Sequence, residues 1–154
     1  MCIYNQIFFH FANTPFSPLA GGFLTGKVSI KTPETDLSGG RWAPGAFSAY
    51  LDVFDKPSVH AAVRKYYYFC QDNKMSSTEA SLRWLMYHSA LREGDGIIIG
   101  ATSVDQLKGN LEMVRKGPLD REIIQAVEEL WESVRGEINW AVTNDRPEGS
   151  VAST

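Results

Sequence analysis

The feature that most constrains the fold is the order of signals between residues 76 and 114, where two helix starts flank a short β-branched run. Ser76-x-x-Glu79 and Ser103-x-x-Gln106 are both capping boxes, in which side chains satisfy free backbone groups at a helix start. Between them, a Gly-Asp-Gly turn precedes Ile97-Ile98-Ile99, which predicts a short buried strand ended by Gly100. Because helix, strand, glycine and helix follow in this order, the sequence predicts an α/β fold.

Apolar residues recur at helical spacing on both sides of this unit. One helix is predicted from about Ser58 to Asp72, a second from the Ser76 cap to near Leu91, and a third after Ser103. Gly117-Pro118 ends the third helix, and Asp120 is placed to cap a fourth. The residues expected to face the core are Val59, Ala62, Val63, Tyr66 and Cys70 in the first helix, Leu82, Leu85 and Met86 in the second, Leu107, Leu111 and Val114 in the third, and Ile123, Val127, Leu130, Trp131 and Val134 in the fourth.

Upstream of these helices lies the segment Phe16 to Lys27, which reads FSPLAGGFLTGK. It begins apolar and continues into glycines, which is typical of a buried strand that opens into a loop with exposed backbone. The following stretch from Val28 to Pro57 is rich in Gly, Pro, Ser and Thr without a sustained period. A long loop of this kind in a compact domain is usually functional.

Composition excludes several classes of function. The 154 residues are 44% hydrophobic and 21% charged, with a formal net charge of −3, so the chain is expected to fold and lacks the basic surface of a nucleic-acid binder. Cys2 and Cys70 form no disulfide framework and no metal-binding pair, and Met1 to Ala12 is too short to span a bilayer. We therefore expect a cytoplasmic protein with no metal site and no membrane or nucleic-acid partner.

Two segments could bind a phosphate. From Gly100 to Asn110, a glycine and a capped helix start bring backbone N–H groups to the positive end of a helix dipole. An α/β turn needs a small residue and a cap with or without a ligand, so this segment alone does not establish a site. In FSPLAGGFLTGK, the glycines allow a phosphate close to the backbone and Lys27 supplies positive charge, although the G-x-G-x-x-G of a dinucleotide-binding Rossmann fold is missing.

Taken together, the two segments resemble the aldo-keto reductase family, and in particular its aflatoxin-aldehyde reductase and potassium-channel beta-subunit branch. Ser81-Leu82-Arg83-Trp84 is similar to the family's A-L-R-W helix, and Gly117-Pro118-Leu119 matches a tripeptide before its last helix. The resemblance covers about residues 16–140 and implies the C-terminal part of a (β/α)8 TIM barrel. The full barrel needs about 250 residues, so the barrel is expected to be incomplete. Residues 1–15 are read as a divergent N-terminal segment and residues 141–154 as a flexible tail.

The resemblance also implies NADP(H) as the cofactor and assigns residues to its binding. The start of the first segment would line the path of the nicotinamide and pyrophosphate, Lys27 would reach the phosphates, and Arg41 would help to hold the adenosine phosphate. The residues after Ile99 would contact the 2′-phosphate and the adenine, although Gly109 stands where relatives usually carry Glu or Gln. The implied cofactor-binding residues are Phe16, Ser17, Pro18, Leu19, Ala20, Gly21, Lys27, Arg41, Gly100, Thr102, Gln106 and Asn110.

The family transfers hydride from NADPH to an aldehyde or ketone with a tyrosine, a lysine, an aspartate and a histidine. In the family all four precede the region matched here, so no catalytic residue is assigned. Tyr66, Tyr67 and Tyr68 are read as packing residues, and no partner is identifiable for the three histidines. Three hypotheses follow: a truncated reductase that is inactive alone, a non-catalytic module that docks on or complements another barrel chain, or a compact α/β domain without a ligand. Substrate would bind only if the barrel were completed.

Overall fold

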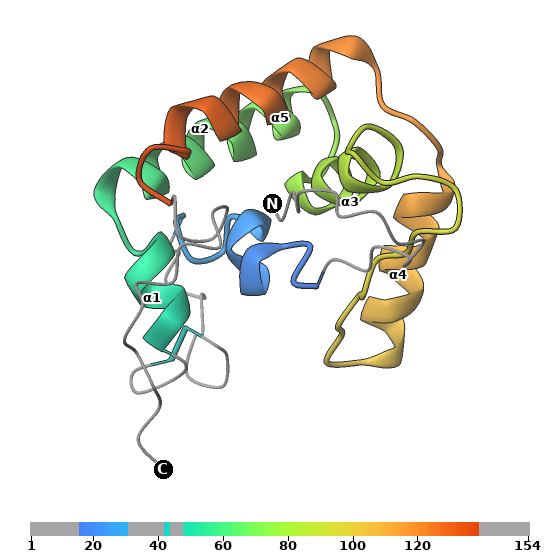
Figure 1. Ribbon diagram of the computed structural model, residues 1–154, viewed down its shortest axis with the longest axis horizontal. Helices are drawn as coiled ribbons and strands as arrows, with labels where there is room; N and C mark the ends of the chain where they lie inside the picture. Colours follow the sequence, from blue (N-terminus) through green and yellow to red (C-terminus); the bar gives the residue numbers. More distant parts are fainter. Residues whose placement is uncertain (1–15, 31–41, 44–47, 139–154) are drawn as a thin grey trace, which may run out of the picture.

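The computed structural model describes residues 16–30, 42–43 and 48–138, and what it describes is helical. Five α-helices and one short 3₁₀ helix are present within these ranges (Figure 1). Helices α2 and α5 run side by side along one edge, α1 and α4 lie at opposite ends, and the 3₁₀ helix η1 lies between those ends below α2 and α5. The elements are η1 (Ala20–Thr25), α1 (Ser48–Phe54), α2 (Pro57–Asp72), α3 (Ser77–Tyr87), α4 (Val104–Arg115) and α5 (Arg121–Val134).

The strand expected at Ile97-Ile98-Ile99 is not formed, and the described residues contain no strand at all. A strand is stabilised by hydrogen bonds to a neighbouring strand, and no described segment pairs with these isoleucines. Ile98 is 55% exposed as a result. The strand expected at the start of the first segment is likewise absent: Phe16 is 66% exposed, and the chain turns at once into η1.

Both predicted serine caps are confirmed. The Ser76 hydroxyl accepts a hydrogen bond from the Glu79 N–H at 3.0 Å, and the Ser103 hydroxyl accepts one from the Gln106 N–H at 3.1 Å. The reciprocal half of each box is not formed as predicted. The side-chain Oε1 of Gln106 instead accepts the N–H of Thr102 at 2.7 Å. Asp120 occupies the N-cap position of α5 without a side-chain bond.

Two helix boundaries differ from the predictions. The helix that begins after Ser76 ends at Tyr87 and not near Leu91, because the following residues find other partners. His88 caps the helix end through its backbone, and its ring Nε2 accepts the N–H of Leu119 at 2.8 Å. The stretch predicted as one long loop, Val28 to Pro57, contains helix α1. The predicted first helix agrees with α2 to within one residue, with Pro57 in its first turn.

The core forms two clusters that meet at Leu130. The first joins α2, α3 and α5, and its buried members include Tyr66, Cys70 and Trp84. The second surrounds Phe23 of η1, whose ring lies against Trp42, Phe54 and His60 with centroid separations of 5.0, 5.6 and 5.0 Å. The predicted core faces of α2 and α5 are thereby confirmed at Val59, Val63, Tyr66, Cys70, Ile123, Val127 and Val134, which are all buried. The prediction is wrong for Met86, Leu107 and Leu111, which are 41%, 39% and 41% exposed because no described element covers them.

A buried ion network fixes α3 to the end of α4. The Glu79 carboxylate binds the guanidinium of Arg83 at 2.8 Å and the ammonium of Lys116 at 2.6 Å. Arg83 also donates to the carbonyl oxygens of Gly117 and Pro118 at 2.8 and 2.7 Å. Both side chains of the Glu79–Arg83 pair are nearly buried. Through the bonds of Arg83 to Gly117 and Pro118, this network holds the chain just after α4 against α3.

Candidate functional site

The glycine segment forms a compact turn with three glycines at positive φ: Gly21 (67°), Gly22 (96°) and Gly26 (83°). Its backbone bonds are mostly internal, since the Leu19 carbonyl accepts the N–H of Gly22 at 2.9 Å and the Ser17 carbonyl accepts that of Ala20 at 2.8 Å. The Gly21 carbonyl accepts the Trp42 indole N–H at 3.0 Å. The glycines thus provide a left-handed backbone, as only residues without a Cβ do readily.

Gly26 has a second constraint, which comes from the helix beside it. A Cβ built there would overlap Cδ2 of Tyr67 in α2, so the ring occupies the space that any side chain would need. Gly22, by contrast, has no atom within 4 Å of an added Cβ. Gly26 therefore sets how closely the glycine segment approaches α2.

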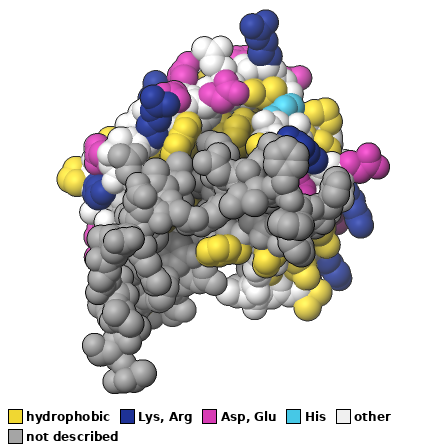
Figure 2. Space-filling view, viewed as in Figure 1, with side chains coloured by type: hydrophobic (Ala, Val, Ile, Leu, Met, Phe, Trp, Pro, Cys, Tyr) yellow, Lys and Arg dark blue, Asp and Glu magenta, His cyan; other side chains and the backbone are white. Residues whose placement is uncertain are grey.

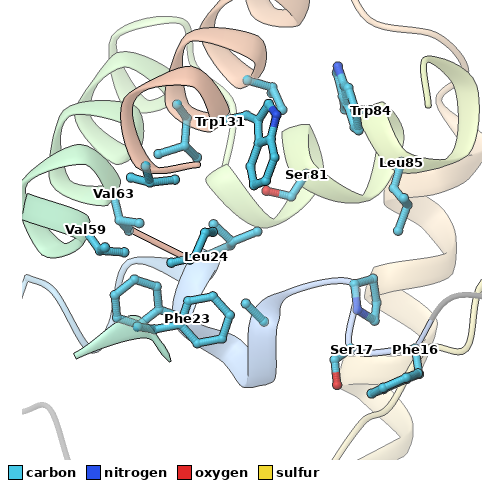
Figure 3. Close-up of a pocket in the computed structure, with 17 residues that line it drawn as sticks. Phe16, Ser17, Phe23, Leu24, Val59, Val63, Ser81, Trp84, Leu85 and Trp131 are labelled. Atoms are coloured by element: carbon cyan, nitrogen blue, oxygen red, sulfur yellow. The ribbon is translucent and has the colours of Figure 1, made fainter. Parts of the chain in front are cut away.

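The first predicted residues line a cavity of about 100 Å³ enclosed by η1, α2, α3 and α5 (Figure 3). Phe16, Ser17, Pro18 and Ala20 form part of its wall. The opposite wall comes from the helices, with Trp131 and Ser81 directed toward Leu24 of η1 in this view. Periodicity predicted that most of these helical residues are buried, but it did not predict a cavity between them: Val59, Val63, Ser81, Trp84, Leu85, Val127, Leu130, Trp131 and Val134.

The second predicted set lies in α4 and just before it, beside a separate shallow hollow. The hollow is lined by Ile99, Ala101, Thr102, Ser103, Val104 and Leu107. Thr102 is the one member of the predicted set that lines this hollow, and both its N–H and its hydroxyl donate to the Gln106 side chain at 2.7 and 2.9 Å. Gly100 is exposed, with open space where a side chain would be. The helix start therefore presents backbone N–H groups and a threonine hydroxyl on an accessible surface.

The structure keeps the two sets apart: no residue of the second lines the cavity that the first surrounds. Leu19 and Gly21 belong to the turn but not to the cavity wall, and Lys27 is exposed beyond the end of η1. Arg41 lies outside the described residues.

Asn110 is placed differently from the other members of its set. It is only 4% exposed, and its Nδ2 has no hydrogen-bond partner among the described residues. A buried amide donor without a partner costs about 1–3 kcal/mol, so an acceptor that reached this nitrogen would stabilise the chain, although the atom is closed to solvent in this structure. Among the described residues, the indole N–H of Trp84 is the other buried side-chain donor that has no hydrogen-bond partner.

The packing role predicted for the tyrosine run is confirmed for Tyr66 and for Tyr67, whose ring lies against Gly26, but not for Tyr68, which is 54% exposed. Tyr66 is buried, and its hydroxyl bonds the Ser77 carbonyl at 3.3 Å and the Ser81 hydroxyl at 3.1 Å. Burial raises the pKa of Tyr66 far above its usual value, so it does not give up its proton near neutral pH. Burial also raises the pKa of the Cys70 thiol to about 11.

The histidines do have partners, contrary to the reading from sequence. His60 Nδ1 lies 3.0 Å from the Ser29 hydroxyl, and its Nε2 lies 2.9 Å from the Asp55 carboxylate. This chain of bonds ties the turn after η1 to the start of α2. Ser29 and Asp55 lie 31 and 5 residues before His60 in the sequence and are part of no periodic pattern. No sequence signal therefore indicated that they would bond to His60. His10 lies outside the described residues.

Within residues 16–30, 42–43 and 48–138, no group of His, Cys, Asp or Glu side chains could hold a metal ion. None of the helices in these ranges combines the length and the apolar character needed to cross a membrane.

The glycine turn, the start of α4 and the helices around them lie within a sequence that matches a known protein family. The sequence profile of the Aldo/keto reductase family matches residues 10–132, and the chain belongs to that family. The family's members are nicotinamide-dependent carbonyl reductases built on a (β/α)8 barrel. The helical architecture described above is compatible with a part of such a barrel.

Individual relatives agree with this assignment. The chain is 38% identical over 123 residues to an aldo-keto reductase of Pseudocercospora fijiensis, 33% identical over 133 residues to aflatoxin B1 aldehyde reductase member 2 of Mus musculus, and 32% identical over 129 residues to aldo-keto reductase family 7 member A3 of Homo sapiens. These matches use 78–79% of this chain but only 41%, 35% and 39% of the relatives. The chain therefore spans about two fifths or less of the length of the relatives it matches.

Proposed function

We propose that this chain is the NADP(H)-binding C-terminal part of an aldo-keto reductase, and that it contributes to the reduction of an aldehyde or ketone only when the rest of the barrel is supplied. The observation that carries the proposal is the exposed start of α4. There an open glycine, the Thr102 hydroxyl and the N–H groups of the first turn of α4 lie together at the surface of a chain whose family uses a nicotinamide cofactor.

The α4 start fits the phosphate end of the cofactor on physical grounds. The positive end of a helix dipole and the N–H groups of its first turn favour an anion. Gly100 leaves open space beside these groups, and the Thr102 hydroxyl can turn to a phosphate oxygen in place of Gln106. Asn110 then supplies an amide donor, for which the adenine edge is a suitable acceptor.

The glycine segment would hold the other end of the cofactor. Phe16, Ser17 and the residues up to Gly21 would line the path of the nicotinamide, while Lys27 and Arg41 would neutralise phosphate charge. Lys27 is exposed and free to reach a ligand from the end of the turn. When bound, the nicotinamide supplies the hydride, and this chain's residues orient it and keep its phosphates in place.

We also propose that the chain alone does not turn over substrate. Hydride transfer to a carbonyl needs a proton donor at the carbonyl oxygen. Tyr66 is buried with its hydroxyl already bonded and its pKa raised, which makes it unsuitable as this donor. The donor would have to come from a barrel portion outside this chain. A reducing, cytoplasmic setting suits the free thiol of Cys70.

Fluorescence titration with NADPH tests the proposal directly. The wild-type chain should bind saturably, and Gln106→Ala and Lys27→Met should each weaken binding by about tenfold through loss of one polar contact. The matched controls are Gln125→Ala and Lys65→Met, at exposed positions on α5 and α2. Equal affinity for all five proteins, or no binding by the wild type, would show that these segments do not hold the cofactor.

The second candidate function, a non-catalytic module that docks on another barrel chain, is favoured by one observation. The apolar side chains of Phe16 and Ile98 are 66% and 55% exposed, and the three isoleucines have no strand partner within the described residues. Unpaired β-branched segments of this kind readily add to a sheet edge. Mixing the chain with the full-length Pseudocercospora fijiensis relative and measuring co-elution tests this candidate. Separate elution at high concentration would reject it.

A further inference from the structure

The α4–α5 connection, residues 116–120, is bonded to α3 at three successive residues. In Figure 1 this connection, drawn in orange, runs past α3 on its way to α5. Arg83 donates to the two carbonyl oxygens that precede Leu119, at 2.8 and 2.7 Å. Leu119 then donates its own N–H to Nε2 of His88 at 2.8 Å. The last of these bonds differs from the others, because its acceptor is a group that gains a proton near neutral pH.

The direction of this bond fixes the state of the His88 ring. A backbone N–H can only donate, so Nε2 carries a lone pair, and the proton of the neutral ring lies on Nδ1. A protonated imidazole carries an N–H at both nitrogens and accepts no hydrogen bond. Protonation of His88 would therefore set two donors against each other across the 2.8 Å gap, and the bond to Leu119 would be lost.

Leu119 cannot exchange this acceptor for water without leaving its place. The residue is only 6% exposed, and it belongs to the core cluster that joins α2, α3 and α5. A buried N–H that loses its acceptor destabilises the folded chain until it reaches another one. Loss of the His88 bond therefore favours a movement that takes the Leu119 backbone to solvent and draws its side chain out of the cluster.

The other charged groups near the connection belong to types that do not titrate together with histidine. Lysine and arginine ordinarily keep their proton up to about pH 10, and carboxylates ordinarily take one up near about pH 4. Glu79 is also engaged by Arg83 at 2.8 Å and by Lys116 at 2.6 Å. Among the described residues, no ion pair involves His88. The titratable and charged groups that flank the connection on α3, α4 and α5 are Glu79, Arg83, Tyr87, Lys116, Asp120 and Arg121.

Fields from further away act on the ring in opposite senses. His88 caps the C-terminal end of α3, which favours a positive charge, whereas the N-terminal end of α5 begins two residues beyond Leu119 and opposes one. Acidic and basic side chains are interspersed over the described part of the face in Figure 2, with no extended patch of one sign. The bond to Leu119 is therefore the interaction that most directly distinguishes the neutral ring from the charged one.

We propose that His88 is a pH-sensitive latch on the α4–α5 connection. In its neutral form it holds Leu119 in the core, and on protonation it releases the connection from α3. The latch operates over the range in which histidine side chains change charge, about pH 8 to 5. Because α4 carries Gln106 and Asn110, the latch also affects how firmly the proposed cofactor residues are held, and this consequence alone rests on the proposed function.

Amide hydrogen exchange of the full 154-residue chain, resolved by NMR, tests the latch. After correction for the intrinsic exchange rate, protection of the Leu119 amide should fall by about tenfold from about pH 7.5 to about pH 5.5, because one hydrogen bond is lost. The amide of Tyr66, inside α2, should change by less than about twofold, because local opening leaves the other helices intact. Nitrogen chemical shifts of the His88 ring at about pH 8 should place its proton on Nδ1.

Three variants separate the latch from a general effect of acid. His88→Gln keeps a side-chain acceptor that does not titrate, so Leu119 should stay protected at both pH values. His88→Phe has no acceptor and should leave Leu119 poorly protected at both. His60→Gln is the matched control, since it removes the other described histidine, which bonds Ser29 and Asp55 instead, and it should keep the wild-type response at Leu119.

Equal protection of Leu119 at both pH values in the wild type would overturn the proposal, as would a pH response that persists in His88→Gln. A ring proton found on Nε2 at about pH 8 would show that His88 does not accept this bond. If Leu119 and Tyr66 lose protection together, acid unfolds the whole chain and the latch is rejected. None of these readouts uses NADPH, so failure of the latch is distinguishable from failure of the proposed cofactor site.

Discussion

Replacing Gly26 with alanine should destabilise the chain more than the same replacement at Gly22 in the same turn. Two costs add at this position. The residue has φ of 83°, where a Cβ costs about 1–2 kcal/mol, and the new methyl overlaps the Tyr67 ring of α2. Forcing extra volume into a packed site typically costs a further ~1–3 kcal/mol. Gly26→Ala should therefore lower the free energy of unfolding by about 2–5 kcal/mol.

Gly22 provides a matched control for the backbone cost alone. Its φ is 96° and an added Cβ meets nothing within 4 Å, so Gly22→Ala should cost only about 1–2 kcal/mol. Urea unfolding of both variants measures the difference. In a Tyr67→Ala background the ring is gone, and the cost of Gly26→Ala should fall to that of Gly22→Ala. If Gly26→Ala costs no more than Gly22→Ala, or Tyr67→Ala rescues nothing, the close approach of this turn to α2 is not what the structure indicates.

Two further predictions concern buried groups. Glu79→Gln should destabilise the chain by about 3–5 kcal/mol, because it leaves the nearly buried Arg83 without a counter-charge, whereas Lys116→Met, at a position 56% exposed, should cost at most about 1 kcal/mol. Thermal unfolding that ranks the two variants equally would contradict this account of the network. Because burial raises the pKa of Cys70 to about 11, the unfolded chain loses this proton first as the pH rises, so the free energy of unfolding should fall from about pH 9 to pH 11, by up to about 1.4 kcal/mol per pH unit from this group. Cys70→Ala should flatten the slope over that window, and an unchanged slope would show that the thiol does not contribute.

Local features of the fold were predictable from sequence because they depend on neighbouring residues. In the caps of α3 and α4, the serine hydroxyl bonds a backbone N–H only three residues further along the chain. The buried face of α2 follows from the helical spacing of its apolar residues. Pro57 fixes the start of α2 within one residue. These signals need no knowledge of the rest of the chain.

Features that depend on distant partners were not predictable in the same way. Ile97-Ile98-Ile99 has the composition of a buried strand, but a strand requires a second strand to pair with, and the described residues offer none. Helix α1 lies in a stretch without a sustained period, and its residues Val53 and Phe54 join the cluster around Phe23. Tertiary packing decides such elements, so a local pattern does not reveal them.

The candidate site likewise contains features that could be predicted from neighbouring residues and features that could not. The residues at the start of α4 could be chosen from the glycine, the cap and the helix that follow one another in the sequence. The burial of Asn110 could not, since it depends on how α4 packs against the rest of the molecule. The bonds of His60 to Ser29 and Asp55 join segments up to 31 residues apart, and only the folded chain brings them together.

One measurement tests the central claim most directly: NADPH fluorescence and NADPH consumption followed in the same sample of the purified chain, with 4-nitrobenzaldehyde as the carbonyl substrate. The account predicts saturable binding of NADPH, a melting temperature that rises with NADPH concentration by mass action, and no consumption above the rate without protein. Turnover that stays with the pure chain would contradict the proposal that catalysis needs the rest of the barrel. Absence of any binding would contradict the proposal that this chain carries the cofactor site.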